Sequence, residues 1–315
     1  MMVVDRNRGS FECRHFYDLP EFLESDDLLV INNSRVIPAK LSGKKSTGAT
    51  IEMLLLEKAG SPAIWEVLLR PAKRVAVGTK ISFNGHSWAE ITERISDKKW
   101  VVSFHPETEF DAFLEQFGSA PLPPYIKRRK GDLKDPGDLL RYQTIYAKNP
   151  GSVAAPTAGL HFSNEILERL KGRKTNIAEV TLHVGYGTFL PIETEFVTEH
   201  RMEHETYEVG EETAEQINRA ERVVAVGTTS VRTLESASDP DGRILPGKGS
   251  TNLFIYPGYR FKTVDRLLTN FHLPASSLFL LVCAFAGRDL MRRAYTKAID
   301  EKFRFYSYGD CMLIL

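Results

Sequence analysis

Two histidines, His161 and His183, lie among residues that are unusually small for a protein core. His161 belongs to the run GSVAAPTAGLHF, and His183 belongs to the run AEVTLHVGYGTFLP. Glycine lets the backbone approach a ligand closely, and Ala, Ser and Thr leave open space beside it. An imidazole that titrates near neutral pH can act in such a place as a general base or acid. The two segments therefore predict two walls of a pocket.

The strand pattern before His183 supports this interpretation. Residues 177–184 alternate so that Glu179, Thr181 and His183 share one face, which leads directly into the sequence GYG. In open α/β sheets ligands bind beyond the carboxyl ends of the strands, so His183 and Thr181 are well placed. A single histidine is more often a buried residue bonded to a carbonyl. The second histidine in a similar glycine-rich setting favours a functional site.

Two further segments could bind a ligand. Residues 227–232, GTTSVR, offer backbone N–H groups and hydroxyls at a helix start, which suits a carboxylate or phosphate. An ordinary N-terminal cap explains this turn equally well. Asn270 and His272 form another polar element at the end of an apolar run, where a structural turn is the alternative.

A compact cationic cluster is a candidate RNA-binding element. It lies beside Tyr125 and consists of Lys127, Arg128, Arg129 and Lys130. Such a run is commonly a solvated face, but it can also bind RNA phosphates.

Two other motifs are weaker. The segment 200–204, HRMEH, fits the HxxEH pattern of zinc peptidases. That chemistry needs a helix, whereas the flanking residues favour an extended chain in which positions four apart are about 13 Å apart. The segment 242–249 has the spacing of a Walker loop, but Gly249 stands where Ser or Thr should bind magnesium. We therefore predict no metal site and expect a surface loop over residues 239–249.

The composition is that of a globular protein of the reducing cytoplasm. The chain has 315 residues, with 41 Lys and Arg against 41 Asp and Glu, so no global field attracts polyanions. Three scattered cysteines argue against a disulfide framework. The longest apolar run, residues 278–286, is much shorter than the roughly 20 residues of a membrane span. It predicts a buried helix or strand, and we expect no membrane attachment.

The order of elements predicts an α/β fold with an insertion. Short alternating runs between residues 47 and 105 suggest a small antiparallel barrel, followed by a helix over residues 110–117. From residue 141 strands alternate with helices, and the early strand 28–31 is expected to join their sheet. The fold class is thus α/β, a mixed-sheet domain of residues 1–42 and 119–315 with an inserted small antiparallel β-barrel domain of residues 43–118.

Taken together, the motifs closely resemble one family, S-adenosylmethionine:tRNA ribosyltransferase-isomerase, the QueA family of queuosine biosynthesis. The resemblance covers nearly the whole chain in order. Its motifs are LVINNSRVIPAKL, WEVLLRPAKRV, PLPPYIKR, RYQTIYA, GSVAAPTAGLHF, TLHVGYGTF, VVAVGTTSVRTLES, IYPGYRF, LLTNFHLP and FRFYSYGDCMLIL. The chain departs from the family pattern at Glu203, where a histidine is usual. The pattern also usually begins with an earlier YDLPxxLIAQ-like segment, so part of the sheet and of the pocket is expected to be missing.

The resemblance implies a reaction. The ribosyl group of S-adenosylmethionine would be transferred to the aminomethyl-deazaguanine wobble base of tRNA, giving epoxyqueuosine and releasing adenine and methionine. S-adenosylmethionine is then a co-substrate, and no prosthetic group is implied. We expect a cytoplasmic monomer that binds tRNA and is active at the junction of its two domains. The alternatives are a zinc-dependent hydrolase built on HRMEH and a catalytically inactive RNA-binding module.

The chemistry suggests roles for the candidate residues. A sulfonium acidifies the adjoining ribose C–H, so a base is needed, and His183 or His161 is the candidate. Adenine leaves more easily when protonated, which His272, Asp310 or the other histidine could assist. Co-substrate binding is assigned to a larger set of residues. Aromatic faces would lie near the sulfonium. A hydroxyl-rich turn or an arginine would bind the methionine carboxylate. The set consists of Thr181, Tyr186, Thr228, Thr229, Ser230, Arg232 and Asn270, with Phe189 and Tyr259 as further aromatic neighbours.

Overall fold

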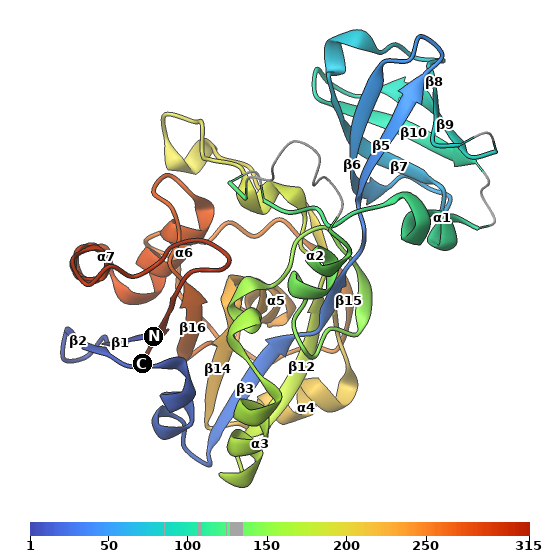
Figure 1. The fold of residues 1–315 in the computed structure, drawn as a ribbon. Coiled ribbons are helices and arrows are strands. Elements are labelled where there is room, and N and C mark those ends of the chain that lie inside the picture. Colours follow the sequence, from blue (N-terminus) through green and yellow to red (C-terminus); the bar gives the residue numbers. More distant parts are fainter. Residues whose placement is uncertain (85, 106–108, 124, 127–134) are drawn as a thin grey trace. The chain divides into compact units, whose positions relative to one another are not determined.

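The computed structural model describes residues 1–84, 86–105, 109–123, 125–126 and 135–315, and the chain divides into two compact units (Figure 1). The α/β unit comprises Met1–Arg35, Thr144–Asn149 and Ala155–Leu315. The barrel unit comprises Val36–Gln143 and Pro150–Ala154, a wider range than the predicted insertion. The predicted fold class, a mixed-sheet α/β domain interrupted by an antiparallel barrel, is confirmed.

The described residues of the barrel unit form a closed antiparallel barrel with the strand order β10-β7-β6-β5-β8-β9. Alternate side chains of each strand fill the interior, as Trp65, Val67 and Leu69 of β7 do. The predicted strands are present, but β5 was missed. The strands are β5 (Lys40–Lys45), β6 (Thr50–Lys58), β7 (Ile64–Arg70), β8 (Lys80–Ser82), β9 (Trp88–Arg94) and β10 (Lys99–His105).

Short helices accompany this barrel. Helix α1 (Phe110–Phe117) follows β10 as predicted and buries Phe110, Phe113 and Leu114. Its last turn ends at Gly118, whose N–H bonds to the carbonyl of Leu114. A Cβ at Gly118 would lie 2.2 Å from the carbonyl oxygen of Pro38, so only glycine fits there. The others are η2 (Ala72–Arg74) and α2 (Pro136–Arg141).

In the described part of the α/β unit, nine strands form one sheet in the order β15-β13-β12-β3-β14-β16-β17-β1-β2. Neighbouring strands β12, β3, β14 and β16 are parallel, and β17 runs antiparallel to β16. The strands are β1 (Met2–Asp5), β2 (Ser10–Cys13), β3 (Asp27–Asn32), β12 (Asn176–Leu182), β13 (Glu205–Val209), β14 (Arg222–Val226), β15 (Gly247–Thr251), β16 (Arg266–Asn270) and β17 (Cys311–Ile314). A separate pair is formed by β4 (Ser34–Val36) and β11 (Asn149–Ser152).

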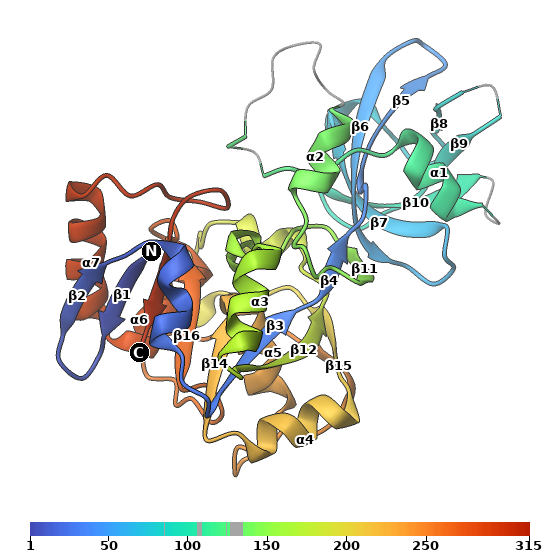
Figure 2. The same cartoon turned by 60° about the horizontal axis from the view of Figure 1, so that its bottom comes forward.

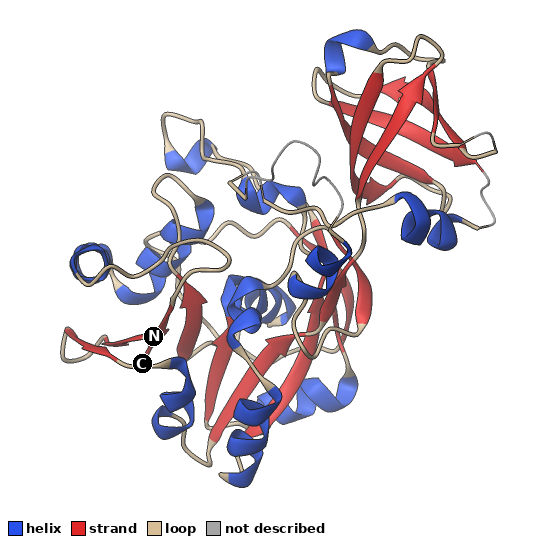
Figure 3. Cartoon of the chain, in the orientation of Figure 1, coloured by secondary structure: helices blue, strands red, loops and turns tan. Residues whose placement is uncertain are grey.

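Helices cover both faces of this sheet (Figures 2 and 3). Leu28 and Val30 of β3 pack in the core formed with α4, α5, α6 and α7, whereas Leu29 and Ile31 pack with α3, η1 and η3. The period of two along β3 therefore supplies both layers. The helices are η1 (Phe16–Phe22), η3 (Thr157–His161), α3 (Asn164–Gly172), η4 (Tyr186–Phe189), η5 (Val197–Glu199), α4 (Glu211–Arg219), α5 (Gly227–Ala237), α6 (Ser277–Ala286) and α7 (Arg288–Asp300).

Two predicted local features are present in the structure. Ser163 caps α3 by accepting a bond from the N–H of Ile166, and the apolar run 278–286 is helical. Among helices of the described segments, none is long and apolar enough to cross a membrane. The surface loop expected over residues 239–249 was wrong in its last part. Gly247 begins β15, which pairs with β13 at the edge of the sheet.

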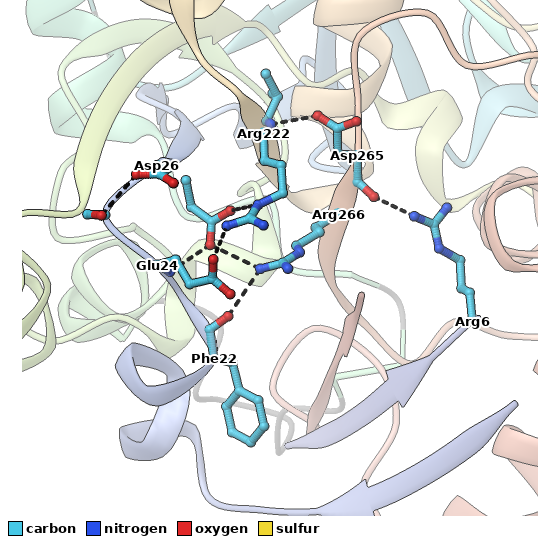
Figure 4. Close-up of polar contacts among 10 residues, drawn as sticks. Arg6, Phe22, Glu24, Asp26, Arg222, Asp265 and Arg266 are labelled. Carbon is cyan, nitrogen blue, oxygen red and sulfur yellow. Dashed lines mark hydrogen bonds and ion pairs between the residues drawn. The ribbon is translucent and has the colours of Figure 1, made fainter. Parts of the chain in front are cut away.

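The amino ends of three parallel strands are joined by a buried carboxylate, and Figure 4 shows its partners Arg222 and Arg266. Asp27 begins β3, and its side chain is fully buried. It accepts hydrogen bonds from Arg222 of β14 at 2.8 Å, from Arg266 of β16 at 3.0 Å and from the N–H of Glu24 at 2.7 Å. A buried charge is tolerated only when it is paired and hydrogen-bonded. Asp27 thus fixes the end of the sheet opposite the candidate site.

Candidate active site at the carboxyl ends of the parallel strands

The carboxyl ends of β12, β3, β14 and β16 lie at one edge of the sheet. His183 follows β12, Asn33 follows β3, the helix start at residues 227–230 follows β14, and Asn270 ends β16. The strand order reverses at β3, because β12 lies on one side of it and β14 on the other. Such a reversal is where ligands bind in open α/β sheets. Because β17 is antiparallel to β16, Asp310 lies at this edge as well.

The polar face of β12 is held by a network that includes Thr181. The Thr181 hydroxyl donates to Asn33 Oδ1 at 2.7 Å and accepts from the amide of Asn149 at 2.8 Å. The amide of Asn33 donates to Glu179 at 2.9 Å, and Glu179 also pairs with Lys148 at 2.6 Å. Asn33 and Thr181 are buried, so these bonds are protected from water. The network gives the strand end a fixed conformation.

His183 is held through the backbone by both neighbouring strands. The buried Asn32 side chain bonds to both backbone groups of Leu182, at 3.0 and 3.1 Å, which secures the residue before His183 to β3. The N–H of His183 donates to the carbonyl of Thr206 beside β13 at 2.9 Å. The half-buried imidazole is therefore presented from a rigid backbone.

A buried ion pair supports the loop that follows His183. One carboxylate oxygen of Glu205 accepts the N–H of Gly185 at 2.7 Å and the hydroxyl of Thr188 at 3.2 Å. The other oxygen pairs with Arg232, and both side chains are about 95% buried. Arg232 also donates to the carbonyl of Leu253 at 3.0 Å. The guanidinium predicted to bind the co-substrate is thus occupied with Glu205 and backbone carbonyls, and Glu205 fixes the glycine-rich loop.

Glu205 was not predicted as a functional residue, although the sequence contains a signal for it. Period two in ETYEV places Glu205, Tyr207 and Val209 on one face of β13, and the structure buries Glu205 and Val209. A carboxylate in register with apolar residues requires a buried partner.

The start of helix α5 combines unbonded helix N–H groups with hydroxyls. Gly227 adopts φ of +86°, a conformation that favours glycine, and Thr228, Thr229 and Ser230 are buried in the first turn. The Ser230 hydroxyl donates to the carbonyl of Val226 at 2.7 Å. Among the described residues, the buried hydroxyl of Thr229 has no hydrogen-bond partner. A carboxylate would suit this helix start, because the first N–H groups of a helix lack internal acceptors.

His161 lies against Asn270, which fixes its tautomer. The side-chain amide of Asn270 accepts from the Thr157 hydroxyl at 3.1 Å and donates to the carbonyl of Tyr306 at 3.3 Å and to His161 Nε2 at 3.2 Å. Because this amide nitrogen is only a donor, Nε2 accepts and Nδ1 carries the proton. Burial lowers the pKa of His161 to about 4, so the ring is neutral at pH 7.

His272 and Asp310 have different environments. His272 is buried, its Nε2 lies 2.8 Å from the Thr269 hydroxyl, and burial lowers its pKa to about 3. Burial acts to raise the pKa of Asp310, but hydrogen bonds from Arg304 outweigh burial and hold it below the ordinary value. These bonds come from the backbone N–H at 2.7 Å and the guanidinium at 3.0 Å. At neutral pH His272 is therefore uncharged and Asp310 is ionised.

The lowered pKa of His272 gives an expected pH dependence of stability. Its folded-state value lies below the ordinary value of 6.5, so the unfolded chain binds more protons as pH falls through 6.5 and stability is lost. Between pH 7.5 and 5.5 this contribution amounts to about 1.4 kcal/mol. Denaturant unfolding at both pH values should show a smaller pH-dependent loss in His272→Gln than in the unaltered protein. An equal loss in the two proteins would contradict the assignment.

The remaining predicted residues lie elsewhere. Tyr186 begins η4, in the loop that Glu205 holds, and the hydroxyl of Tyr259 bonds to Glu235 at 3.0 Å. The cluster Lys127, Arg128, Arg129 and Lys130 lies outside the described residues. Residues 200–204 are not helical, and the described segments contain no group of three or more metal-ligating side chains that could hold an ion.

The fold and this edge define a class of protein: a mixed-sheet α/β enzyme scaffold with an attached antiparallel barrel and a polar site at a strand-order reversal. The family model described as queuosine biosynthesis protein matches residues 1–314, and the chain belongs to this family.

Named relatives agree with the family match. The S-adenosylmethionine:tRNA ribosyltransferase-isomerase of Syntrophus aciditrophicus is 56% identical over 334 residues, covering 100% of this chain and 92% of the relative. The protein of the same name from Natranaerobius thermophilus is 51% identical with the same coverage. The crystal structure of S-adenosylmethionine tRNA ribosyltransferase from Thermotoga maritima is similar with a TM-score of 0.52 and 36% identity, covering 100% of this chain and 91% of that one.

Proposed function

We propose that the chain is an S-adenosylmethionine:tRNA ribosyltransferase-isomerase. It transfers the ribosyl group of S-adenosylmethionine to the aminomethyl-deazaguanine wobble base of tRNA and releases adenine and methionine. Family membership supports this function. The structural observation that carries it is the gathering of His183, the α5 start and the His161–Asn270 pair at one sheet edge. Such a site offers a base, an anion-binding helix start and a fixed hydrogen-bond donor.

His183 is the proposed base. The sulfonium of the co-substrate acidifies the adjoining ribose C–H, and an imidazole can accept that proton. His183 is only half-buried and lies at the end of β12, beside the loop fixed by Glu205. His161 is less suited as a base, because its Nε2 already accepts a bond from Asn270 and its pKa is about 4.

His161 has a different proposed role. Its Nδ1–H can donate a hydrogen bond to the co-substrate, since the tautomer is fixed by Asn270 through Nε2. We propose that Asn270 positions His161 and that His272 supports the end of β16 through Thr269. Asp310, which is ionised and bonded to Arg304, is proposed to orient the segment before β17.

The methionine carboxylate is proposed to bind at the start of α5. The N–H groups of the first turn and the buried hydroxyl of Thr229 can donate to it, and the helix dipole favours negative charge there. Arg232 is proposed to act through Glu205, because its guanidinium already bonds to that carboxylate and to the carbonyl of Leu253. Tyr186, in the supported loop, remains the proposed aromatic neighbour of the sulfonium.

The reaction as proposed uses S-adenosylmethionine as a co-substrate and needs no prosthetic group. All three cysteines are free, which suits the reducing cytoplasm that we propose as the location. We propose that the enzyme is a monomer.

The test is a direct assay for adenine. The protein is incubated with S-adenosylmethionine and tRNA that carries the aminomethyl-deazaguanine precursor, and adenine is measured chromatographically. We expect one adenine for each modified tRNA. Firm tRNA binding without adenine release would support the inactive RNA-binding module instead. Stoichiometric zinc that is lost in His200→Ala would support the hydrolase.

A further inference from the structure

The outer surface of the barrel carries a stacked aromatic pair that the proposed reaction does not use. Trp88 begins β9 and His105 ends β10, and the two residues are paired directly in the strand register. Their rings stack at a centroid distance of 3.9 Å with an interplanar angle of 15°. Trp88 is half-buried, whereas Trp65 and Trp100 are only 3% and 4% exposed. Trp88 is therefore the accessible indole of the chain.

Lysine side chains flank this pair. Ser82 of β8 is opposite Trp88, and Lys44 of β5 is opposite Ser82. Since alternate residues face outward, Lys44, Ser82, Trp88 and His105 form one row across neighbouring strands β5, β8, β9 and β10. The ammonium group of Lys80 lies 4.3 Å from the Trp88 ring centroid. The indole is thus accompanied by an imidazole and an ammonium group.

The charge of the barrel segment agrees with a polyanionic partner. Residues 36–143 contain 17 Lys and Arg against 13 Asp and Glu, and the excess of four equals the charge of Lys127, Arg128, Arg129 and Lys130, which lie outside the described residues. Glu90, opposite Lys80 in the register, lies 3.9 Å from the Lys80 ammonium and only partly offsets the lysines. Aromatic faces together with amines are the combination that binds single-stranded nucleic acid, because the rings stack on bases and the amines contact phosphates.

We propose that three residues of this row, Lys44, Trp88 and His105, together with the adjacent Lys80, bind an unpaired nucleotide of the tRNA substrate. The base stacks on Trp88 in the place of the Lys80 ammonium, and Lys44 and Lys80 contact the flanking phosphates. Replacement of the Lys80 ammonium by a base is favourable, because an exposed ammonium interacts only weakly with a ring, whereas a base stacks on the ring over a larger area. Lys80 can move, since its side chain is 63% exposed. This inference rests on the proposed function for the identity of the RNA.

The first test measures steady-state kinetics with precursor-containing tRNA. Trp88→Ala is expected to raise the KM for tRNA about tenfold, which corresponds to about 1.4 kcal/mol. The kcat and the KM for S-adenosylmethionine should stay within about twofold of the unaltered protein, because stacking on the barrel leaves the sheet-edge residues untouched. Trp88→Phe keeps an aromatic face and should restore the KM to within about threefold.

A pair of lysine variants controls for charge. Lys44→Ala is expected to weaken tRNA binding and to reduce the slope of log affinity against log salt by about 0.7 to 0.9. Lys98→Ala removes the same charge at the opposite end of the β9–β10 hairpin, where the side chain is exposed, and should leave the slope unchanged. Equal effects of the two variants would overturn the proposed contact.

Fluorescence gives a readout that does not depend on catalysis. A tRNA transcript should quench the emission of the accessible Trp88, and the quenching should disappear in Trp88→Phe. Unaltered quenching in that variant, or a KM for tRNA in folded Trp88→Ala within about twofold of the unaltered protein, would overturn the proposal. If the unaltered protein releases no adenine but shows Trp88 quenching, the proposed function fails and the RNA-binding row stands.

Discussion

Replacing His183 with alanine is expected to lower kcat by at least about a hundredfold. A positioned general base contributes on the order of 10² to 10⁴ to the rate, and His183 is the proposed base at the end of β12. Adenine release under saturating S-adenosylmethionine and tRNA measures the effect. The thermal unfolding midpoint should change little, because the residue is only half-buried and its backbone bond to Thr206 remains.

His204→Ala is the matched control. His204 is exposed, and its ring nitrogen lies 3.4 Å from the hydroxyl of Ser250 in β15. Its loss should leave kcat within about twofold. Full activity in His183→Ala together with loss of activity in His161→Ala would transfer the role of the base to His161. Loss of activity in His204→Ala would favour the metal-binding alternative.

Asp27→Ala is expected to cause the largest loss of stability, about 3–5 kcal/mol in the free energy of unfolding. Removal of the carboxylate leaves Arg222 and Arg266 without their shared partner, although Arg222 retains its bond to Glu24. The uncompensated charge of Arg266 is the more costly, because its side chain is only 16% exposed. Denaturant unfolding at pH 7 measures the effect.

The neighbouring carboxylate provides a control within the same turn. Asp26 is exposed and accepts a bond from Ser25, so Asp26→Ala should change the free energy of unfolding by less than about 1 kcal/mol. Similar losses in Asp27→Ala and Asp26→Ala would show that Asp27 does not fix the strand ends. Because Asp27 lies at the amino ends of the strands, folded Asp27→Ala protein should retain its KM for both substrates.

Elements with strong local patterns could be predicted from the sequence. The apolar alternation of residues 64–70 and 100–104 identified β7 and β10, and Ser163 and Gly118 marked helix ends that the structure contains. Strand β5 could not be found in this way, because KLSGKK has little apolar alternation. Its Gly43 is required by tertiary contact, since a Cβ would lie 2.5 Å from Cγ2 of Ile81.

The candidate site was predictable as a region. Histidines and a hydroxyl-rich turn after successive strands indicated a sheet edge, and the structure has His183, residues 227–230 and Asn270 at that edge. The tautomer of His161 depends on Asn270, which is 109 residues away in the chain. The ion pair that occupies the Arg232 guanidinium likewise depends on Glu205, 27 residues earlier in the chain. Such pairings arise from the packing of distant elements, and local spacing contains no information about them.

The buried pair of Glu205 and Arg232 also has a consequence for how the edge of the sheet assembles. Strand β13 is matched to β12 over a short stretch, Thr181 to Glu208 and Leu182 to Tyr207, so backbone pairing alone specifies the alignment weakly. A slip by one residue would turn Glu205 to the opposite face and leave Arg232, anchored on α5, as a buried unpaired charge. That penalty disfavours sheets in which β13 is misaligned. The pair thus favours the single register in which β13, with β15 beside it, joins the sheet.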